Sequence, residues 1–336
     1  MALACGADAV FALPVSFACA AADRFALGGI TLLNALGVVT HQAFGCESAG
    51  DSEALRRAAA CLNEEPPAFR ETLRGGLDAG LPYPQAQAEA LEAACGVPAG
   101  MLGTPNNILA VAYLRALEKT ASAVRPVFVQ RQGSRSTGPG GTGSPLPSSA
   151  IRELILRGEP DLALAEVPAA SAAIIRECVS AGRLCRPEAL TQALFYRLYT
   201  ASHYELAACA PHGEGLENRL VRALSGHPAS TEELLDRLKT RRYTRAALRR
   251  WLNQLLLGFR PGSQPDTPDH LRLLGFRESA RPLLSEIRKR AALPLVTKPA
   301  RGKAYLADDA RAELLWSLGA GQAASLYEQS PIILSE

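Results

Sequence analysis

Short apolar runs alternate with segments of helical periodicity over the first 130 residues, and this alternation constrains the fold more than any other feature. The apolar runs lie at about 9–13, 38–44 and 124–130. The helical segments are expected at about 23–36, 51–63, 67–78, 84–95 and 106–119. Such alternation predicts a parallel sheet with helices packed on it.

The remainder of the chain has a different pattern. Residues 132–147 are rich in Gly, Ser and Pro, which predicts a loop that does not pack. From about residue 160 we find only helical periods and turn signals, until a short extended segment at 293–297. Since 336 residues are enough for two cores, we expect an α/β domain over 1–160 and a mainly helical domain over 161–336.

Positive charge is concentrated in the second half. Residues 237–303 hold 17 Lys and Arg but only 4 Asp and Glu, in a chain whose net charge is +3. A basic surface on folded helices suits a polyanion, because each neutralised phosphate releases counterions. The alternative is a solvated helix face. The candidate nucleic-acid contacts are Lys239, Arg241, Arg242, Arg245, Arg249, Arg250 and Arg272.

Two candidate ligand contacts follow predicted strands. Gly45 lies at the end of one strand, where a residue without a side chain lets backbone approach a nucleotide. Arg131 directly follows another strand, where a cation can meet phosphate. A plain strand-to-helix turn and a solvated surface arginine are the competing interpretations.

Two further candidates begin predicted helices. In Thr104-Pro105-Asn106-Asn107, one amide can cap the helix while the other contacts a base or ribose, or both can serve simple capping. Ser148, Ser149 and Arg152 place hydroxyls and a cation in a first helical turn, which suits phosphate or, alternatively, an ordinary serine cap.

Other patterns are less informative. Gly138-x-Gly140-x-x-Gly143 matches the dinucleotide fingerprint, but its polar and proline-rich flanks indicate a loop. The eight cysteines and five histidines lack metal-ligand or disulfide spacing, so we expect no metal site and free thiols in a reducing cytosol. The apolar segment before Arg24 could pass for a secretory signal, but it lacks a basic start. We therefore expect a cytoplasmic protein.

Read in order, these segments resemble one family. DAVFALP, ADRFALGGITLLNALG, FGCES, TPNNILAVAYLRAL and SSAIR are similar to the bacterial tRNA(Met) cytidine acetate ligases, and EGLENRLVRAL, LLDRLKTRRYTRAALRR, LRLLGF and LPLVTKP continue the match. The resemblance implies a Rossmann-like nucleotidyltransferase domain followed by a helical domain that helps to hold tRNA. It implies that ATP activates acetate as acetyl-adenylate and that the acetyl group passes to N4 of the wobble cytidine of elongator tRNA(Met).

The resemblance also carries residue roles. By matching position, Gly45, Asn106, Arg131 and Gln132 fall where the family contacts ATP. Ser148, Ser149 and Arg152 fall on the segment that closes the phosphate site in related nucleotidyltransferases. Mg²⁺ is expected beside ATP, and neither DNA nor a membrane is expected as a partner. No side chain is singled out as a proton acceptor.

This sequence departs from the family at one motif. It contains no HxGH, whose histidines bind the triphosphate in the family, and Met1 aligns inside the family's first domain. A βαβ unit of roughly 30 residues or more is therefore expected to be missing. Either the start was placed too far downstream, or this is a truncated relative that binds tRNA without catalysis. A small-molecule adenylyltransferase is a third possibility, but the concentrated positive charge argues against it.

Overall fold

The computed structural model describes residues 1–131, 146–208, 215–240, 243–260, 262, 264–323 and 329–335. Most of the expected Gly/Ser/Pro loop, including Gly138, Gly140 and Gly143, lies outside the described residues. The strands are β1 (Ala9–Ala12), β2 (His41–Cys46), β3 (Arg125–Gln130), β4 (Leu271–Arg277), β5 (Leu295–Val296) and β6 (Ile332–Leu334).

These strands form two small sheets. β2 and β3 pair in parallel, from His41 opposite Arg125 to Cys46 opposite Gln130, as the strand–helix alternation predicts. β1 belongs to the other sheet, where it pairs antiparallel with β4. β4 in turn pairs in parallel with β5 and with β6. The α/β prediction is therefore confirmed, but placing β1 in one parallel sheet with β2 and β3 was wrong.

The partner of β1 was missed because β4 does not alternate. Leu271, Arg272 and Leu273 are all buried in succession, so both faces of the strand are covered. A strand buried on both faces reads as a continuous apolar run, which sequence alone does not separate from a helical segment. The expected division near residue 160 stays a prediction, and this sheet takes strands from both sides of it.

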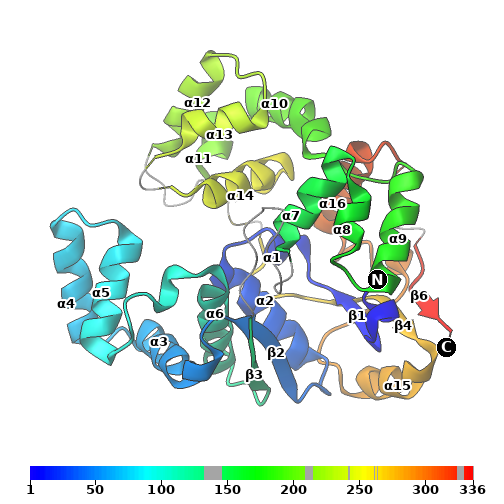
Figure 1. The fold of residues 1–336 in the computed structure, drawn as a ribbon, viewed down its shortest axis with the longest axis horizontal. Helices are drawn as coiled ribbons and strands as arrows, with labels where there is room; N and C mark the ends of the chain where they lie inside the picture. Colours follow the sequence, from blue (N-terminus) through cyan, green and yellow to red (C-terminus); the bar gives the residue numbers. More distant parts are fainter. Residues whose placement is uncertain are drawn as a thin grey trace.

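Helices make up most of the described chain (Figure 1). The first part contains α1 (Val15–Ala18), α2 (Ala22–Ala35), α3 (Ser52–Glu64), α4 (Pro67–Asp78), α5 (Tyr83–Cys95) and α6 (Pro105–Lys119). The remainder contains α7 (Ser148–Arg157), α8 (Pro160–Leu164), α9 (Ala169–Ser180), α10 (Thr191–Thr200), α11 (His203–Ala208), α12 (Leu216–Ser225), α13 (Thr231–Leu238), α14 (Arg245–Leu256), α15 (Arg281–Arg290) and α16 (Ala307–Gly319).

Helix α2 joins two hydrophobic cores. Its residues Ala26 and Ile30 pack into the core around β2, α3 and α6. Its residues Leu32 and Ala35 pack into the core that contains β4 and α15. Because one helix contributes to both cores, the two sheets are held together although their strands do not pair with one another in the described chain.

The helices α10 to α14 form a lobe with a core of its own, seen at the top of Figure 1. Leu220, Leu234, Leu235 and Trp251 are almost fully buried in it. Ser230 and Thr244 cap α13 and α14 by accepting hydrogen bonds from backbone N–H groups.

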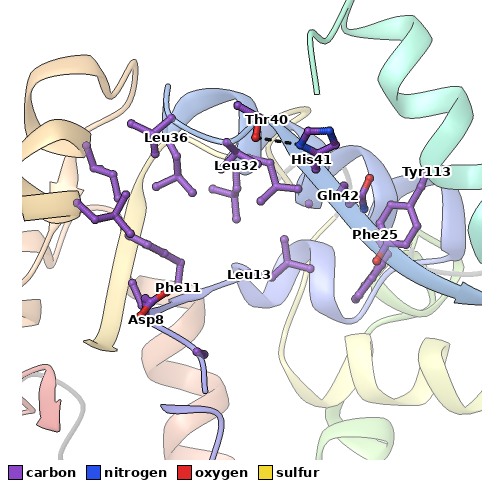
Figure 2. A pocket seen from close by; sticks show the side chains of 18 residues that line it. Asp8, Phe11, Leu13, Phe25, Leu32, Leu36, Thr40, His41, Gln42 and Tyr113 are labelled. Atoms are coloured by element: carbon purple, nitrogen blue, oxygen red, sulfur yellow. Dashed lines mark hydrogen bonds between the residues drawn. The ribbon is translucent and has the colours of Figure 1, made fainter. Parts of the chain in front are cut away.

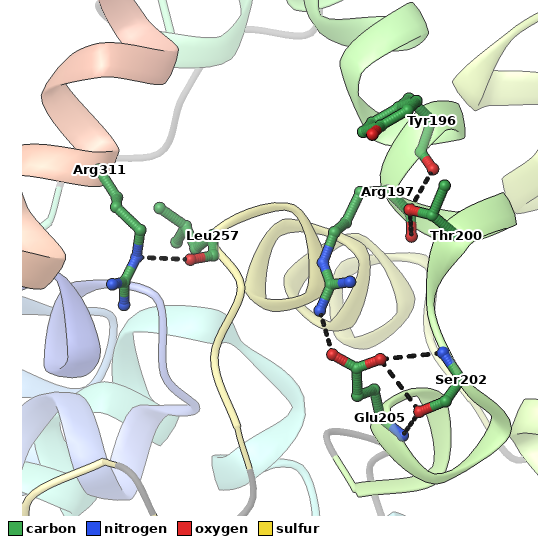
Figure 3. A network of polar contacts seen from close by, with 7 residues as sticks. All are labelled: Tyr196, Arg197, Thr200, Ser202, Glu205, Leu257 and Arg311. Atoms are coloured by element: carbon green, nitrogen blue, oxygen red, sulfur yellow. Dashed lines mark hydrogen bonds and ion pairs between the residues drawn. The ribbon is translucent and has the colours of Figure 1, made fainter.

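Glu205 on α11 connects this helix to α10 in the same lobe. Its carboxylate accepts hydrogen bonds from Arg197 at 2.8 Å and from the backbone N–H of Ser202 at 2.9 Å (Figure 3). These interactions, led by the hydrogen bond from Arg197, lower the pKa of Glu205 to about 2.

An apolar cavity of about 710 Å³ lies between β1 and β2 (Figure 2). Its lining includes Phe11 and Leu13 from the β1 segment, Leu32 from α2 with Leu36 directly after this helix, and Ile287 from α15. Within the described chain, β1 and β2 are each paired along only one edge, and the cavity borders both strands. A single parallel sheet would contain both β1 and β2, and the structure has this cavity between the two strands instead.

The seven cysteines in the described ranges are all free, as expected, and Cys46 and Cys61 are buried. Burial is the main reason that the pKa of the Cys61 thiol is raised to about 12. None of the helices in the part of the chain that the structure describes has the length and apolar character to cross a membrane.

Candidate functional site at the ends of β2 and β3

The carboxyl ends of β2 and β3 lie side by side. Arg131 follows β3, and its backbone N–H donates a hydrogen bond of 2.9 Å to the carbonyl of Cys46. A Cβ atom on Gly45 would lie only 3.1 Å from Cγ of Arg131. The glycine therefore leaves room for the arginine side chain, and the structure brings these two predicted residues together. The Arg131 side chain is exposed and has no hydrogen bond or ion pair with a described residue.

Glu47 connects this edge of the sheet to the start of α6. One carboxylate oxygen, Oε1, accepts a hydrogen bond of 2.6 Å from Nδ2 of Asn106. The other, Oε2, accepts from the Thr104 hydroxyl at 2.8 Å and from the backbone N–H of Asn107 at 3.0 Å. Burial acts to raise the pKa of Glu47, but the hydrogen bonds from Asn106, Thr104 and the backbone outweigh it and lower that pKa. The carboxylate is therefore ionised at neutral pH.

Asn107 secures the turn that follows β2. It is 2% exposed, and its Oδ1 accepts hydrogen bonds from the backbone N–H groups of Glu47 and Ser48. Its Nδ2 donates to the Ser48 hydroxyl and to the carbonyl of Met101. Asn107 is thus a structural residue of the site.

One of the two asparagines was expected to cap α6 with its side chain, and the structure does not show this. Neither caps α6 with its side chain, since Thr104 is the cap residue and makes no side-chain capping bond. The carboxylate of Glu47 takes that role by accepting from the N–H of Asn107. Simple capping was wrong because the acceptor comes from the turn after β2, far away in the sequence.

Gln130 completes the network from β3. Its Nε2 donates a hydrogen bond of 2.8 Å to the carbonyl of Glu47, and its Oε1 accepts from the N–H of Ala49 at 3.1 Å. The turn after β2 is therefore held from α6 on one side and from β3 on the other. Gln132, predicted to contact ATP, lies outside the described residues.

The predicted phosphate contacts lie at the start of α7. Pro147 is the cap residue and Ser148 is the first helical residue, so the alternative of an ordinary serine cap was wrong. Ser149 and Arg152 line a separate cavity of about 390 Å³ together with Arg186. The chain between this helix and Arg131 falls largely in 132–145, which the structure does not describe.

The basic residues of α13 and α14 are partly neutralised within the lobe. Arg245 pairs with Glu232 at 2.5 Å and also with Asp236. Arg249 pairs with Glu232 at 2.7 Å. Lys239 is exposed at the end of α13, whereas Arg250 is half-buried and burial lowers its pKa. Arg241 and Arg242 lie outside the described residues.

The basic stretch 237–303 does not form one surface. Arg272 lies in β4 and is only 9% exposed, with its guanidinium donating to the side chain of Gln329. The cluster at Arg288, Lys289 and Arg290 is on α15, at the opposite end of the molecule from α13 and α14 (Figure 1). Counting charge along the sequence missed this separation because the chain leaves the lobe after α14. Arg272 therefore does not share the predicted nucleic-acid surface.

Comparison with known proteins now identifies the family. A family model described as HIGH Nucleotidyl Transferase matches residues 1–330. The chain belongs to the HIGH nucleotidyl transferase family. Its relatives include a tRNA(Met) cytidine acetate ligase from Acetivibrio thermocellus, which is 34% identical over 316 residues, covering 89% of this chain and 74% of the relative. Another, from Thermoanaerobacter sp., is 33% identical, covering 92% and 77%.

Solved structures agree with this assignment to the HIGH nucleotidyl transferases. TmcAL from Thermotoga maritima, in its apo form, has a TM-score of 0.90 and 27% identity, covering 100% of this chain and 86% of that chain. The same protein bound with alpha-thio ATP has a TM-score of 0.89. The predicted resemblance and the nucleotidyltransferase-like α/β fold are therefore confirmed.

Sequence reasoning missed two residues at this HIGH nucleotidyl transferase site, Glu47 and Gln130. Glu47 was quoted only as part of the motif FGCES, and Gln130 only as the end of a strand. The sequence did contain a usable signal. An acidic residue directly after one parallel strand lies at the same sheet edge as the last residue of the neighbouring strand. Only the structure shows that Glu47 meets α6.

Among the described residues, no group of three or more His, Cys, Asp or Glu side chains could hold a metal ion.

Proposed function

We propose that this chain is an ATP-dependent ligase that activates acetate as acetyl-adenylate and acetylates N4 of the wobble cytidine of elongator tRNA(Met). The observation that carries the proposal is its 34% identity, over 89% of its length, to a protein named tRNA(Met) cytidine acetate ligase. A relative of the same fold, with a TM-score of 0.89, has been solved with alpha-thio ATP. Such a tRNA substrate implies a cytoplasmic place of action.

The ATP site of this proposal lies at the carboxyl ends of β2 and β3. Gly45 leaves room there for the side chain of Arg131, whose exposed guanidinium is not committed to a described carboxylate. Asn106 reaches the same edge through its hydrogen bond with Glu47. Gln132 would extend this site, and Ser148, Ser149 and Arg152 would close it around the phosphates.

The proposed chemistry has two displacements. A carboxylate oxygen of acetate attacks the α-phosphorus of ATP, and the bond to the bridging oxygen breaks so that pyrophosphate leaves. The N4 amine of cytidine then attacks the acyl carbon of acetyl-adenylate, AMP leaves, and the amine loses a proton. Negative charge grows on the leaving phosphate oxygens in the first step, and a fixed cation such as Arg131 stabilises that charge.

Among the described residues, no group of three or more His, Cys, Asp or Glu side chains could hold Mg²⁺ by itself. Glu47, the carboxylate of this sheet edge, already accepts three hydrogen bonds from Asn106, Thr104 and the N–H of Asn107. These residues do not fit a magnesium site, and we derive no step through this ion.

The helical region, taken as the tRNA-binding domain over 161–336, would hold the RNA. Lys239 is exposed at the end of α13, and Arg249 is exposed on α14. Recognition of a wobble base also requires that the base leave its stack, because single-stranded loops are read on unstacked bases. Arg241, Arg242, Arg245 and Arg250 would add charge to this surface.

The 336 residues contain no HxGH, so a second candidate is tested beside the first. In that case the chain is a catalytically inactive relative that only binds tRNA. The two candidates differ in whether the chain binds ATP and in whether it forms product.

A labelled-acetate assay separates them. The chain is incubated with labelled acetate, ATP and elongator tRNA(Met), and the nucleosides of the recovered tRNA are analysed. The proposal expects label in N4-acetylcytidine only when ATP is present. Intact tRNA binding without any labelled product, and without ATP binding in equilibrium dialysis, would favour the inactive relative.

A charge-reversal pair tests the RNA surface. Replacing Lys239 and Arg249 by Glu should weaken tRNA binding and lower the dependence of log K on log salt by about 0.7–0.9 per lost phosphate contact. Arg288→Glu, at an exposed position on α15, is the control and should leave both quantities unchanged. If Arg288→Glu had the same effect on tRNA binding as the double substitution at Lys239 and Arg249, this assignment of the surface would be contradicted.

A further inference from the structure

The hydrogen bond between Glu47 and Asn106 determines which end of the Asn106 amide is available. An ionised carboxylate can only accept hydrogen bonds, whereas a carboxamide has one donor end and one acceptor end. The 2.6 Å contact to Oε1 of Glu47 therefore requires the NH₂ group of Asn106 on that side. Its Oδ1 makes no hydrogen bond with a described residue, and the side chain is partly exposed.

The rest of the carboxylate is fixed as well. Oε2 accepts from the Thr104 hydroxyl and from the N–H of Asn107, which is itself held by the buried side chain of that residue. Glu47 cannot turn away from Asn106 without leaving these two donors unsatisfied. The orientation of the Asn106 amide is thus set by three hydrogen bonds that do not involve a ligand.

We propose that Glu47 is a positioning residue that makes Asn106 a reader of a hydrogen-bond donor on the base of the nucleotide, and so selects adenine over guanine. This inference depends on the proposed ATP site. The 6-position of adenine carries an amino group, which donates, whereas that of guanine carries an oxygen, which accepts. A hydrogen-bond acceptor held toward the base therefore pairs with the amino group of adenine, whereas the oxygen of guanine offers it no donor.

A single substitution should invert this polarity. In Glu47→Gln the amide oxygen can replace Oε2 and continue to accept from Thr104 and from the N–H of Asn107. The new NH₂ group then faces Asn106, whose amide must turn to offer its oxygen. The NH₂ group of Asn106 becomes the end that faces the nucleotide, which suits the oxygen of guanine.

The experiment is equilibrium dialysis of the full chain with labelled ATP and, separately, labelled GTP. The wild-type chain should prefer ATP, and Glu47→Gln should lower the ratio of ATP to GTP affinity by about tenfold or more, since one hydrogen bond is both lost and replaced by a mismatch. Glu53→Gln removes an exposed carboxylate in the first turn of α3 and is the matched control for charge. It should keep the wild-type ratio.

The outcomes separate this inference from the proposed function. If the wild-type chain binds neither nucleotide, both are overturned. If it prefers ATP and Glu47→Gln leaves the ratio unchanged, only the role of Glu47 is overturned. The role of Glu47 is also overturned if Glu47→Gln weakens the binding of ATP and of GTP equally. A merely structural residue, or one that orients Asn106 toward ribose, would not alter the preference for one base. Both variants are first shown by circular dichroism to retain the wild-type spectrum.

Discussion

Replacing Asn107 by Ala should destabilise the site strongly, whereas the same change at its neighbour Asn106 should not. Asn107 makes four hydrogen bonds, two to backbone N–H groups after β2, one to the Ser48 hydroxyl and one to the carbonyl of Met101. A typical hydrogen bond contributes about 0.5–1.5 kcal/mol, and an unsatisfied buried group costs about 1–3 kcal/mol. The donors after β2 are only partly buried, so water compensates in part. We expect a loss of roughly 3 kcal/mol in the free energy of unfolding.

The adjacent asparagine is the matched control. Asn106 is partly exposed and makes one hydrogen bond, to Glu47, so Asn106→Ala should cost about 1 kcal/mol or less in stability. Urea unfolding followed by circular dichroism measures the global effect. Hydrogen exchange of the amides of Glu47 and Ser48 measures the local one, and only Asn107→Ala should accelerate it. Equal stability losses in the two variants, or unchanged exchange at Glu47 and Ser48, would refute this reasoning.

Two further predictions concern packing and pH. A Cβ on Gly28 would lie 2.6 Å from ring atoms of the fully buried Phe17, so Gly28→Ala should destabilise by about 1 kcal/mol or more, because overpacking exceeds the gain in helix propensity. Gly29→Ala, next to it on α2, meets no atom closer than 3.8 Å and should stabilise by about 0.5–1 kcal/mol in thermal unfolding. Glu205 has a pKa lowered to about 2, so its stabilising effect is present above the ordinary glutamate pKa and is lost as pH falls through about 2.

Each of these has a clear contrary result. Similar melting temperatures for Gly28→Ala and Gly29→Ala would contradict the packing of α2 against α1. For Glu205, acid titrations of unfolding should show a smaller loss of stability between neutral pH and pH 2 in Glu205→Gln than in the wild type. Parallel titrations of the two proteins would show that the bond with Arg197 does not couple to folding.

Local patterns predicted the α/β part of the fold well. The run 124–130 and the helical spacing at 67–78 correspond to β3 and α4, because their boundaries are marked by Pro, Gly and polar residues. β4 was missed because both of its faces are buried and no alternation remains. Its pairing with β1 could not be predicted either, since register depends on elements separated by most of the chain.

The site was predictable only in part. Gly45 and Arg131 were found because a strand end is visible in sequence, and the structure does bring them together. The role of Glu47 was hidden because its partners are on α6, and a contact between two elements leaves no local pattern. The positive charge was overinterpreted as one surface, since Arg272 shows that a basic residue in a charged stretch can be a buried strand residue.

The pairing of β1 with β4 also affects when the chain can fold. Ala9 lies opposite Phe276, so the backbone partners of the first strand are synthesised only after most of the protein has left the ribosome. Pairings between residues so distant in sequence form slowly, since a long loop must close before they become favourable. Until then the Ala9–Ala12 segment has no strand beside it and offers an open template to other chains. The Ala9–Ala12 segment, although made long before its partner strand, should therefore be among the last elements to acquire its native neighbours.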